Sequence, residues 1–360
     1  MTAGMVTVLV LLALPPPHGR TGGAGTAGAA AGPATLSTVW PAAHPFDLRA
    51  TLPGGATYAP ILILAPATSV GVATSPDGTN ASLVMLTGAN VRVLQTQSPT
   101  GGGSYDGVTV TAGRLFWMHS EGNSDGLADV SLWSAAVSGG PASMLTTDVG
   151  QPLFYGSQYD LVPADGRIYW TSAHADQPGS TELRSIAATG GTVNTQLFAG
   201  PWMLSHWPWL VTAPNAVNAP LRFMNTQTAT ITPITVPANK LVTCDHTWCR
   251  LIPDDRVHAE GIDLVRPDGS DRQHIGDKDS SPISSDPALL DRFEPLLITV
   301  SATLAGTPVS RLSLYDTGRR GLVQIASAAS KAGAQGNYVW WATGDNETLA
   351  WHGLDLRTLH

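Results

Sequence analysis

The chain has 360 residues, a formal charge of −8 at pH 7 and only 13% charged residues, against roughly 25% in an ordinary globular protein. Lys and Arg form no cluster, which argues against binding of nucleic acid or of an anionic membrane surface. The 38 Gly, 27 Pro and 11 Trp residues, without a long run at helical period, favour short strands joined by many turns.

Residues 1–40 are expected to form a leader separate from the fold. Residues 6–14 (VTVLVLLAL) are an apolar run as long as a signal-peptide core, and shorter than the roughly 20 residues that span a membrane. A Gly- and Ala-rich tract follows, with small-residue cleavage positions such as residues 27–29. No Lys or Arg precedes the apolar run, so a signal peptide and an uncleaved disordered leader both stay open. Residues 41–360 are predicted to form one domain without a transmembrane span.

A phrase at residues 113–140 recurs at residues 166–191. In each copy, a Gly-Arg-apolar-aromatic-Trp strand (GRLFW, GRIYW) precedes an alternating strand and a Gly-Gly turn. Weaker copies bring the total to seven units of about 32 to 55 residues, with three visible strands in each unit before the last. A fourth, innermost strand is expected before the aromatic one, for example at residues 108–110 and 159–162. The weaker copies begin near residues 69, 208, 240, 296 and 337.

Small antiparallel sheets repeated at this period predict an all-β fold, a seven-bladed β-propeller. Six or eight blades stay open, because the first unit is faint and the fourth is short. Trp117, Trp170 and Trp341 are expected to fill the wedges between adjacent blades, where large flat side chains fit. The last unit shows only two strands. We therefore expect residues 58–64 (YAPILIL) to pair with it and close the ring, which removes two exposed sheet edges.

The two cysteines, Cys244 and Cys249, lie in LVTCDHTWCRL, a pattern typical of two strands joined by a tight turn. Directly opposed residues of such a pair are close enough for a disulfide. A metal site made of Cys244, His246 and Cys249 is the alternative, but structural zinc normally has four ligands and no second cysteine pair exists. We predict the disulfide, which suits an oxidising, extracytoplasmic compartment.

Three residues are candidates for chemistry. His119 and His174 follow the aromatic strands at near-equivalent positions, and two imidazoles on a shared rim could bind a metal or act as acid and base. Asp160 flanks an expected inner strand and could face the central channel. The plain alternative for all three is a polar residue where a strand leaves the core. Residues 201–209, with three Trp, could be a stacking platform for sugars or peptides, or core packing between blades.

From residue 56 to residue 356, the repeat outline and the G-R-[LI]-[FY]-W strand resemble secreted bacterial β-propellers of the TolB-like type. The chain lacks the Trp-Asp blade ending of WD repeats and the flanking pattern of kelch repeats. The resemblance therefore implies a scaffold and transfers no functional residue. No G-x-S-x-G elbow, His-E-x-x-His motif or Gly-rich phosphate loop occurs, and no cofactor is expected.

The expected function is that of an extracytoplasmic, monomeric scaffold that binds a protein, peptide or glycan, a hypothesis based on fold analogy. The alternative is a propeller enzyme, lyase-like or lactonase-like, with channel-facing His or Asp residues and a divalent metal. A purely structural cell-envelope protein is a third hypothesis that the sequence does not separate from the first.

Overall fold

A computed structural model of the chain describes residues 34–97, 103–122, 128–214, 220–236, 240–253, 261–304, 307–345 and 347–360, without the side chains of residues 301–309. The residues on which the signal-peptide prediction depends, 6–14 and 27–29, lie outside this part. Within it, no helix is long and apolar enough to span a membrane.

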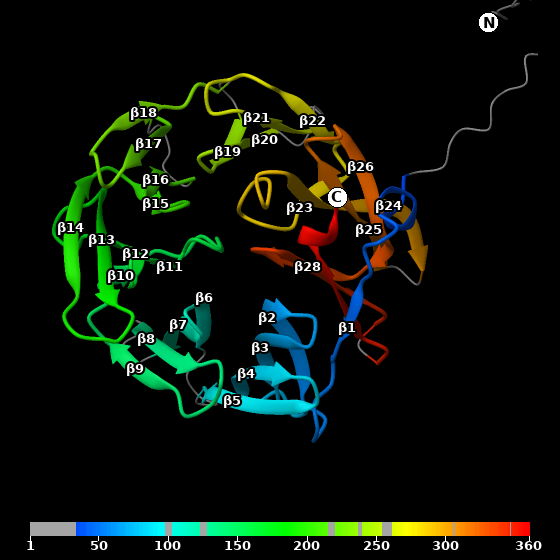
Figure 1. The fold of residues 1–360 in the computed structure, drawn as a ribbon, viewed down its shortest axis with the longest axis horizontal. Helices are drawn as coiled ribbons and strands as arrows, with labels where there is room; N and C mark the ends of the chain where they lie inside the picture. Colours follow the sequence, from blue (N-terminus) through cyan, green and yellow to red (C-terminus); the bar gives the residue numbers. More distant parts are fainter. Residues whose placement is uncertain are drawn as a thin grey trace, which may run out of the picture. The chain divides into compact units, whose positions relative to one another are not determined.

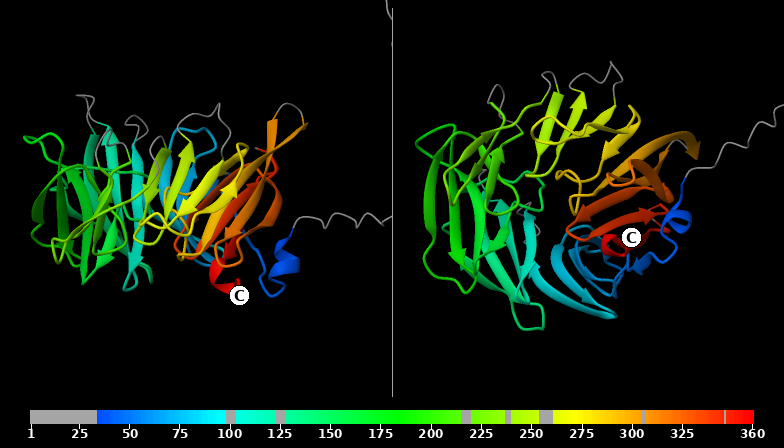
Figure 2. Two further views of the ribbon diagram at one scale, coloured as in Figure 1. Left: turned by 90° about the horizontal axis from the view of Figure 1, so that it is seen from above. Right: turned by 45° about the horizontal axis from the view of Figure 1, so that its top comes forward.

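The described residues form seven antiparallel sheets that stand radially around a central axis (Figure 1). The prediction of a seven-bladed β-propeller is therefore confirmed. In blades 1 to 6 the chain runs outward from the axis, strand by strand, whereas the outermost strand of blade 7 comes from the N-terminal part of the chain. Seen edge-on, the ring is a flat disc (Figure 2).

Blade 1 contains β2 (Thr57–Ala65), β3 (Thr68–Thr74), β4 (Ala81–Thr87) and β5 (Asn90–Thr96), and blade 2 contains β6 (Ser104–Thr111), β7 (Arg114–Gly122), β8 (Ala128–Ala136) and β9 (Ser143–Thr146). Blade 3 contains β10 (Gln151–Pro152), β11 (Val162–Ala164), β12 (Arg167–Ala173), β13 (Ser180–Ala187) and β14 (Asn194–Ala199). Blade 4 contains β15 (Trp202–Leu204), β16 (Trp209–Thr212), β17 (Arg222–Asn225) and β18 (Ile231–Pro233).

Blade 5 contains β19 (Lys240–Cys244), β20 (Cys249–Pro253), β21 (Ile262–Val265) and β22 (Gln273–Gly276), and blade 6 contains β23 (Ser280–Pro282), β24 (Phe293–Leu304), β25 (Thr307–Asp316) and β26 (Gly321–Ala329). Blade 7 contains β27 (Lys331–Gln335), β28 (Tyr338–Thr343), β29 (Ala350–Asp355) and β1 (Phe46–Leu48). The helical segments are α1 (Leu36–Val39) and the 3₁₀ turn η1 (Leu356–Thr358).

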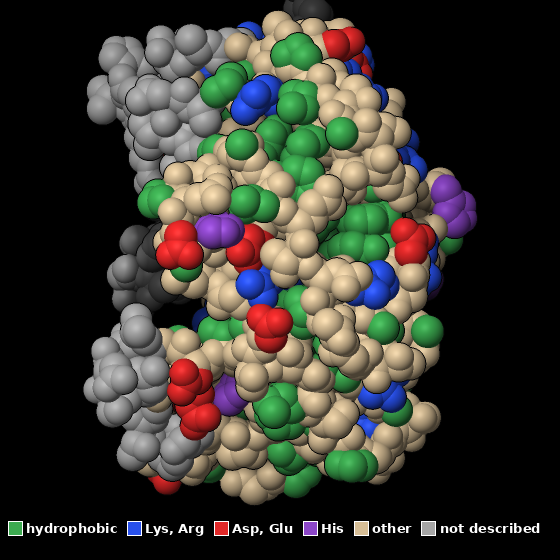
Figure 3. All heavy atoms as spheres, turned by 90° about the vertical axis from the view of Figure 1, so that its left-hand side faces the viewer, with side chains coloured by type: hydrophobic (Ala, Val, Ile, Leu, Met, Phe, Trp, Pro, Cys, Tyr) green, Lys and Arg blue, Asp and Glu red, His purple; other side chains and the backbone are tan. Residues whose placement is uncertain are grey.

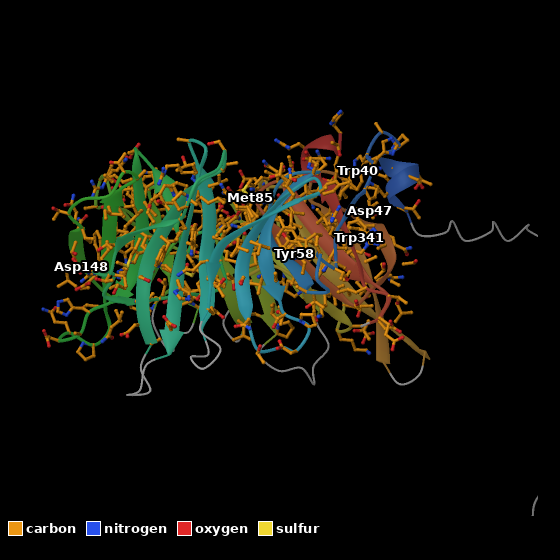
Figure 4. All side chains as sticks on the ribbon, turned by 90° about the horizontal axis from the view of Figure 1, so that it is seen from below. Trp40, Asp47, Tyr58, Met85, Asp148 and Trp341 are labelled. Carbon is orange, nitrogen blue, oxygen red and sulfur yellow. A yellow bond between two sulfur atoms is a disulfide. The ribbon has the colours of Figure 1, made fainter. Side chains whose placement is uncertain are left out.

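The ring is closed by an N-terminal strand, but not by the predicted one. The outer strand of blade 7 is β1, which pairs antiparallel with β29, Phe46 opposite Gly353. Figure 4 shows Asp47 of β1 on the flank of the ring, near Trp341 of the same blade. Residues 58–64 lie instead in β2, the inner strand of blade 1. β1 is paired along one edge only, and its Phe46 and Leu48 side chains are partly buried while Asp47 is exposed, so three residues suffice and make no long apolar run in the sequence.

The three repeated tryptophans occupy matching positions between blades, as predicted. Trp117 on β7, Trp170 on β12 and Trp341 on β28 are 0%, 0% and 4% exposed. Each packs in an apolar cluster that combines residues from the second strand of its own blade with residues of the preceding blade. These partners are Leu83 and Leu94 of blade 1 for Trp117, Phe116 and Leu132 of blade 2 for Trp170, and Leu312 and Leu314 of blade 6 for Trp341.

The glycine that opens each repeated phrase belongs to a tight turn. Gly113 and Gly166 have φ of +72° and +71°, and the residues before them, Ala112 and Asp165, have φ of +46° and +49°. Positive φ at both central residues is the type I′ geometry that joins two strands with the natural twist. The glycine therefore fixes where the aromatic strand begins.

Two further predictions concern the ends of the domain and the cysteines. Leu36 and Trp40 are buried in the cluster between blades 6 and 7, so the propeller includes residues 34–40, which the sequence pattern assigns to the leader (Figure 4). Cys244 and Cys249 are opposite each other on β19 and β20, with Cα atoms 4.0 Å apart, and form the predicted disulfide. The alternative metal site is excluded because both sulfur atoms are bonded to each other.

Candidate functional site

One end of the ring carries the turns between the first and second strands of the blades, and we call it the inner-turn face. Because these turns follow the innermost strands, they surround the axis. The C terminus lies at the same end (Figure 2). The turn between β15 and β16 is residues 205–208, that between β19 and β20 is residues 245–248, and that between β23 and β24 is a longer loop, residues 283–292.

A segment of blade 3 leaves its sheet and crosses the channel. The inner position of this blade is divided between β10 and β11, and residues 153–161 between them are the crossing segment (Figure 1). Ser157 Oγ donates to Asp286 Oδ1 of blade 6 at 2.5 Å, and the Gln158 amide donates to Asp286 Oδ2 at 2.8 Å. Gln158 Oε1 accepts from the Gly336 amide of blade 7 at 3.0 Å. The segment thus links blade 3 to the opposite side of the ring.

Asp160, the predicted channel residue, lies in this segment and shapes it. Its carboxylate accepts from the amides of Tyr155 and Ser157 at 3.0 to 3.1 Å. Burial raises the pKa of Asp160 to about 7, against the lowering effect of these hydrogen bonds. The inner strand expected at residues 159–162 is shorter than predicted, because only Val162 of that range belongs to β11.

His119 and His174 lie at separate places near the opposite end of the ring. The ring of His119 is buried, stacks on Tyr105 at 5.2 Å between centroids and has Nδ1 2.9 Å from Gln95 Nε2. Burial lowers its pKa. His174 Nδ1 accepts from the Asp176 amide, and its Nε2 lies 3.8 Å from Glu182 Oε1. Each histidine has its own partners, and the structure does not bring the pair together.

Two other histidines do meet, at the inner-turn face. His206 in the β15–β16 turn and His246 in the β19–β20 turn are exposed, and their ring centroids are 4.8 Å apart. Tyr159 of the crossing segment contacts His206 edge-on, at 6.4 Å. Burial lowers the pKa of His246, and the neighbouring His206 adds to this effect. An imidazole accepts a hydrogen bond or binds a metal through an unprotonated ring nitrogen, so this pair is a candidate for either role.

A third group, which we call the carboxylate–histidine cluster, consists of Asp245, His246 and Asp291. Each residue offers one potential ligand atom for a metal, and the three atoms lie within 4.8 Å of one another. Asp245 is 5% exposed, and its Oδ1 accepts from the amides of Thr247 and Trp248, both at 2.7 Å. Burial raises the pKa of Asp245 to about 7, and the charge of Asp291 contributes to the rise. Burial also raises the pKa of Tyr159, with a contribution from three nearby carboxylates.

A buried ion pair supports the loop that carries Asp286 and Asp291. Arg250 Nη1 on β20 lies 2.6 Å from Glu294 Oε1 on β24, and both side chains are almost fully buried. Arg250 also donates to the carbonyl oxygens of Ser284 and Ser285 at 2.8 and 2.9 Å. Glu294 Oε2 accepts from the Ala288 amide at 2.6 Å. This pairing fixes a loop in which Ala288, Leu290 and Asp291 all have positive φ, between 46° and 58°.

Beside the crossing segment, the inner-turn face contains a cavity of about 440 Å³, which we call the mouth cavity. Five blades contribute to its wall, and His206 joins it to the histidine pair. Its lining is aromatic, aliphatic and neutral-polar, without Lys, Arg, Asp or Glu. The lining residues are Leu62, Thr109, Val110, Gln158, Tyr159, Leu161, Val162, Pro163, His206, Trp207, Gln335 and Gly336.

Sequence reasoning missed the residues that converge here, although a signal exists. In the units near residues 208 and 240, LSHWPWL and CDHTWCR place a histidine at the same position of the turn, after Ser205 and Asp245. Equivalent turns of adjacent blades lie side by side, so this alignment predicts the His206–His246 pair. No comparable signal marks Asp286 or Asp291.

Several solved structures are similar to the chain. It is similar to a puromycin-hydrolyzing peptidase from Mycobacterium tuberculosis at 17% identity and a TM-score of 0.53, over 91% of this chain and 53% of that one. The chain thus spans about half the length of the peptidase. At this identity the likeness shows the fold alone. No protein-family model and no curated protein sequence matches the chain.

Two weaker structural similarities were also found. The propeller domain of the Trilobed protease from Pyrococcus furiosus aligns at 8% identity and a TM-score of 0.45, over 70% of this chain and 81% of that one. An uncharacterized protein from Listeria monocytogenes aligns at 10% identity and a TM-score of 0.48, over 78% of this chain and 88% of that one.

Proposed function

We propose that this chain is an extracytoplasmic binding scaffold that holds a protein, peptide or glycan partner at its inner-turn face. The observation that carries the proposal is the mouth cavity, whose walls come from five blades and the crossing segment. Its volume, about 440 Å³, is in the range of ligand-binding clefts, roughly 300 to 1,000 Å³. No cofactor is needed for this function.

The composition of the cavity wall supports recognition by shape and hydrogen bonding. Tyr159 and Trp207 supply aromatic surface, and Gln158, His206 and Gln335 supply donors and acceptors. Because the crossing segment is tied to blades 6 and 7, the cavity is formed before the ligand arrives. A preformed site loses little conformational entropy on binding.

The disulfide supports the extracytoplasmic part of the proposal. Cys244 and Cys249 are bonded within a tight turn, and structural disulfides are typical of oxidising compartments. The signal-like leader and the resemblance to TolB-like propellers are two sequence features that also support the proposed export.

The test is a selection for ligands followed by two matched histidine variants. The full chain is used to select from a random dodecapeptide phage library and a glycan array. Dissociation constants of the selected ligands are then measured by calorimetry. His206→Ala removes an exposed side chain of the mouth cavity and is expected to weaken binding by about tenfold. His174→Ala, near the opposite end of the ring, is expected to leave the dissociation constant unchanged. Equal effects of the two variants, or selection of no ligand, would contradict the proposal.

The carboxylate–histidine cluster favours a second candidate function, a metal-dependent enzyme. Two carboxylates and an imidazole are ligands that a divalent transition metal accepts. Metal content of the purified chain, measured by plasma mass spectrometry after dialysis against Zn²⁺ or Mn²⁺, tests this candidate. Stoichiometric metal that is lost in His246→Ala and Asp291→Asn but kept in His174→Ala would support it. A metal-free protein would eliminate it and leave the scaffold.

A further inference from the structure

A second hollow, which we call the side groove, lies next to the mouth cavity between blades 3 and 4. It measures about 380 Å³ and shares Trp207 with the mouth cavity. Figure 3 views this flank of the ring, where hydrophobic side chains lie recessed beside acidic and basic ones. The lining residues are Asp165, Arg167, Tyr169, Leu183, Ser185, Asn194, Thr195, Gln196, Trp207, Thr226 and Gln227.

An aromatic pair forms one part of the groove. The rings of Tyr169 on β12 and Trp207 in the β15–β16 turn are 3.9 Å apart between centroids, with an angle of 31° between their planes. Trp207 Nε1 donates to Asp165 Oδ2 at 3.1 Å, which fixes the orientation of the indole. Both rings stay partly exposed. Aromatic surface that is left uncovered and held in place is suited to stacking against the C–H face of a sugar ring.

The charged side chains of the groove are already engaged. Asp165 accepts from the Trp207 indole. Arg167 donates through Nε to Ser185 Oγ at 3.0 Å and through Nη2 to the Ser185 carbonyl at 2.9 Å. One carboxylate and one guanidinium line the groove, so their formal charges sum to zero, and both are held by hydrogen bonds to neutral groups.

The free hydrogen-bonding groups of the groove are neutral. Asn194 and Gln196 on β14 and Gln227 in the β17–β18 turn are exposed, and their side-chain amides make no hydrogen bond within the described part of the chain. Each amide offers two N–H donors and a carbonyl acceptor. Sugar hydroxyls both donate and accept, so paired hydrogen bonds to such amides satisfy both partners.

We propose that the side groove binds a neutral oligosaccharide, stacked on the Tyr169–Trp207 pair and hydrogen-bonded by the amides of Asn194, Gln196 and Gln227. The inference rests on the proposed binding function, since Trp207 is shared with the mouth cavity. It deepens that function by naming the class of ligand. A glycan chain that lies over Trp207 reaches both hollows.

A proline-rich peptide is the competing ligand for an aromatic groove, because proline rings also pack on aromatic side chains. Such a peptide offers carbonyl acceptors but almost no backbone donors. Its chemistry would leave the carbonyl oxygens of the three amides unpaired, whereas an oligosaccharide supplies donors and acceptors along its whole length. The observations therefore favour the oligosaccharide.

The experiment is calorimetric titration of the full chain with neutral hexasaccharides of β-1,4-glucose, α-1,4-glucose, β-1,4-mannose and N-acetylglucosamine. Decaproline and a hexagalacturonate serve as the proline-rich and anionic comparisons. At least one neutral hexasaccharide is expected to bind with a measurable dissociation constant, more tightly than either comparison.

Four variants then locate the site. Trp207→Ala is expected to weaken binding at least about tenfold, and Trp207→Phe less, because it keeps an aromatic ring. The double variant Gln196→Ala/Gln227→Ala alters only exposed side chains and is expected to weaken binding about fivefold to tenfold. Gln151→Ala, an exposed amide on β10 outside the groove, is the matched control and is expected to change nothing.

Absence of binding by every neutral hexasaccharide at concentrations up to about 10 mM, roughly ten times a weak dissociation constant of about 1 mM, would overturn the inference. So would tighter binding of decaproline, or binding that the groove variants leave unchanged. Each of these results is compared with the earlier test of the scaffold function. If His206→Ala still weakens the binding of a ligand selected there, only the oligosaccharide inference fails and the proposed scaffold function stands.

Discussion

The carboxylates near the axis are held by hydrogen bonds and yet are hard to ionise. Asp160, Asp245 and Asp286 each accept hydrogen bonds from at least one backbone amide, which alone would lower their pKa values. Burial is the larger effect for all three, and it raises the pKa of Asp160 and of Asp245 to about 7. Removal of these groups from water therefore makes the stability of the fold dependent on pH.

The sign of this dependence follows from the direction of the shift. The pKa of Asp245 is about 7 in the folded chain and about 3.8 when unfolded, so the folded state binds more protons between these values. Its stabilising contribution is present below pH 4 and is lost as the pH rises through 7. The free energy of unfolding is expected to fall over this window, with Asp160 contributing in the same direction.

Asp245→Asn tests this account. Asparagine keeps the Oδ1 acceptor for the amides of Thr247 and Trp248 but does not titrate. Urea unfolding in EDTA is expected to show equal stability of variant and wild type at pH 4, and a more stable variant at pH 8. The gain has an upper limit of about 4 kcal/mol, from roughly 1.4 kcal/mol per pKa unit. The exposed Asp176→Asn is the control. A constant difference between variant and wild type at all pH values would contradict the account.

Closure of the ring depends on a strand of three residues. Besides its pairing with β29, β1 is held by Phe46, whose ring lies against Gly353 and contacts Tyr338 edge-on at 6.1 Å. Asp47 Oδ1 lies 2.8 Å from His352 Nδ1. A Cβ atom at Gly353 would overlap the Phe46 ring. The absence of a side chain at this position is thus a condition for closure.

Gly353→Ala is expected to displace Phe46 and to lower the free energy of unfolding by about 1 to 3 kcal/mol, the usual range for overpacking. Hydrogen exchange at residues 46–48 is expected to accelerate. Gly321→Ala on β26 is the matched control, because its nearest neighbour would be 3.9 Å from the added Cβ atom. Similar stability and exchange of the two variants would show that β1 does not depend on this contact.

Elements with strong local patterns were predictable, and those fixed by distant contacts were not. The seven units, the wedge tryptophans and the disulfide follow from repeated phrases, alternation and a tight turn. The strand β1 has only three residues, and its single apolar-polar-apolar alternation is too short to stand out in the sequence. The longer apolar run at residues 58–64 was therefore predicted to close the ring. The crossing segment is held by contacts between residues more than 120 positions apart, such as Ser157 and Asp286, which no local pattern encodes.

The ring as a whole is held by apolar clusters between the blades. Trp117, Trp170 and Trp341 each lie in a different cluster that joins neighbouring blades. A single blade cannot cover both faces of its sheet, so the stability of each depends on its neighbours. Loss of one wedge side chain therefore weakens the closed ring and not one sheet alone.

Trp170→Ala removes a fully buried side chain from such a wedge and is expected to cost about 3 to 5 kcal/mol, the range for truncating large aromatic residues in a core. Trp170→Phe is expected to cost less. Leu241→Ala, at a leucine that is 55% exposed, is expected to change stability by less than about 0.5 kcal/mol. A small loss for Trp170→Ala, measured by chemical denaturation, would contradict the wedge role.

The claim that ligands bind at the inner-turn face is tested most directly by hydrogen–deuterium exchange of the full chain with and without a selected ligand. Protection is expected in residues 153–161, 205–208 and 245–248, which come from three blades and meet only at that end of the ring. The strand ends around His119 and His174, near the other end, are expected to exchange equally in both states. Protection there, with unchanged exchange in the crossing segment, would contradict the account.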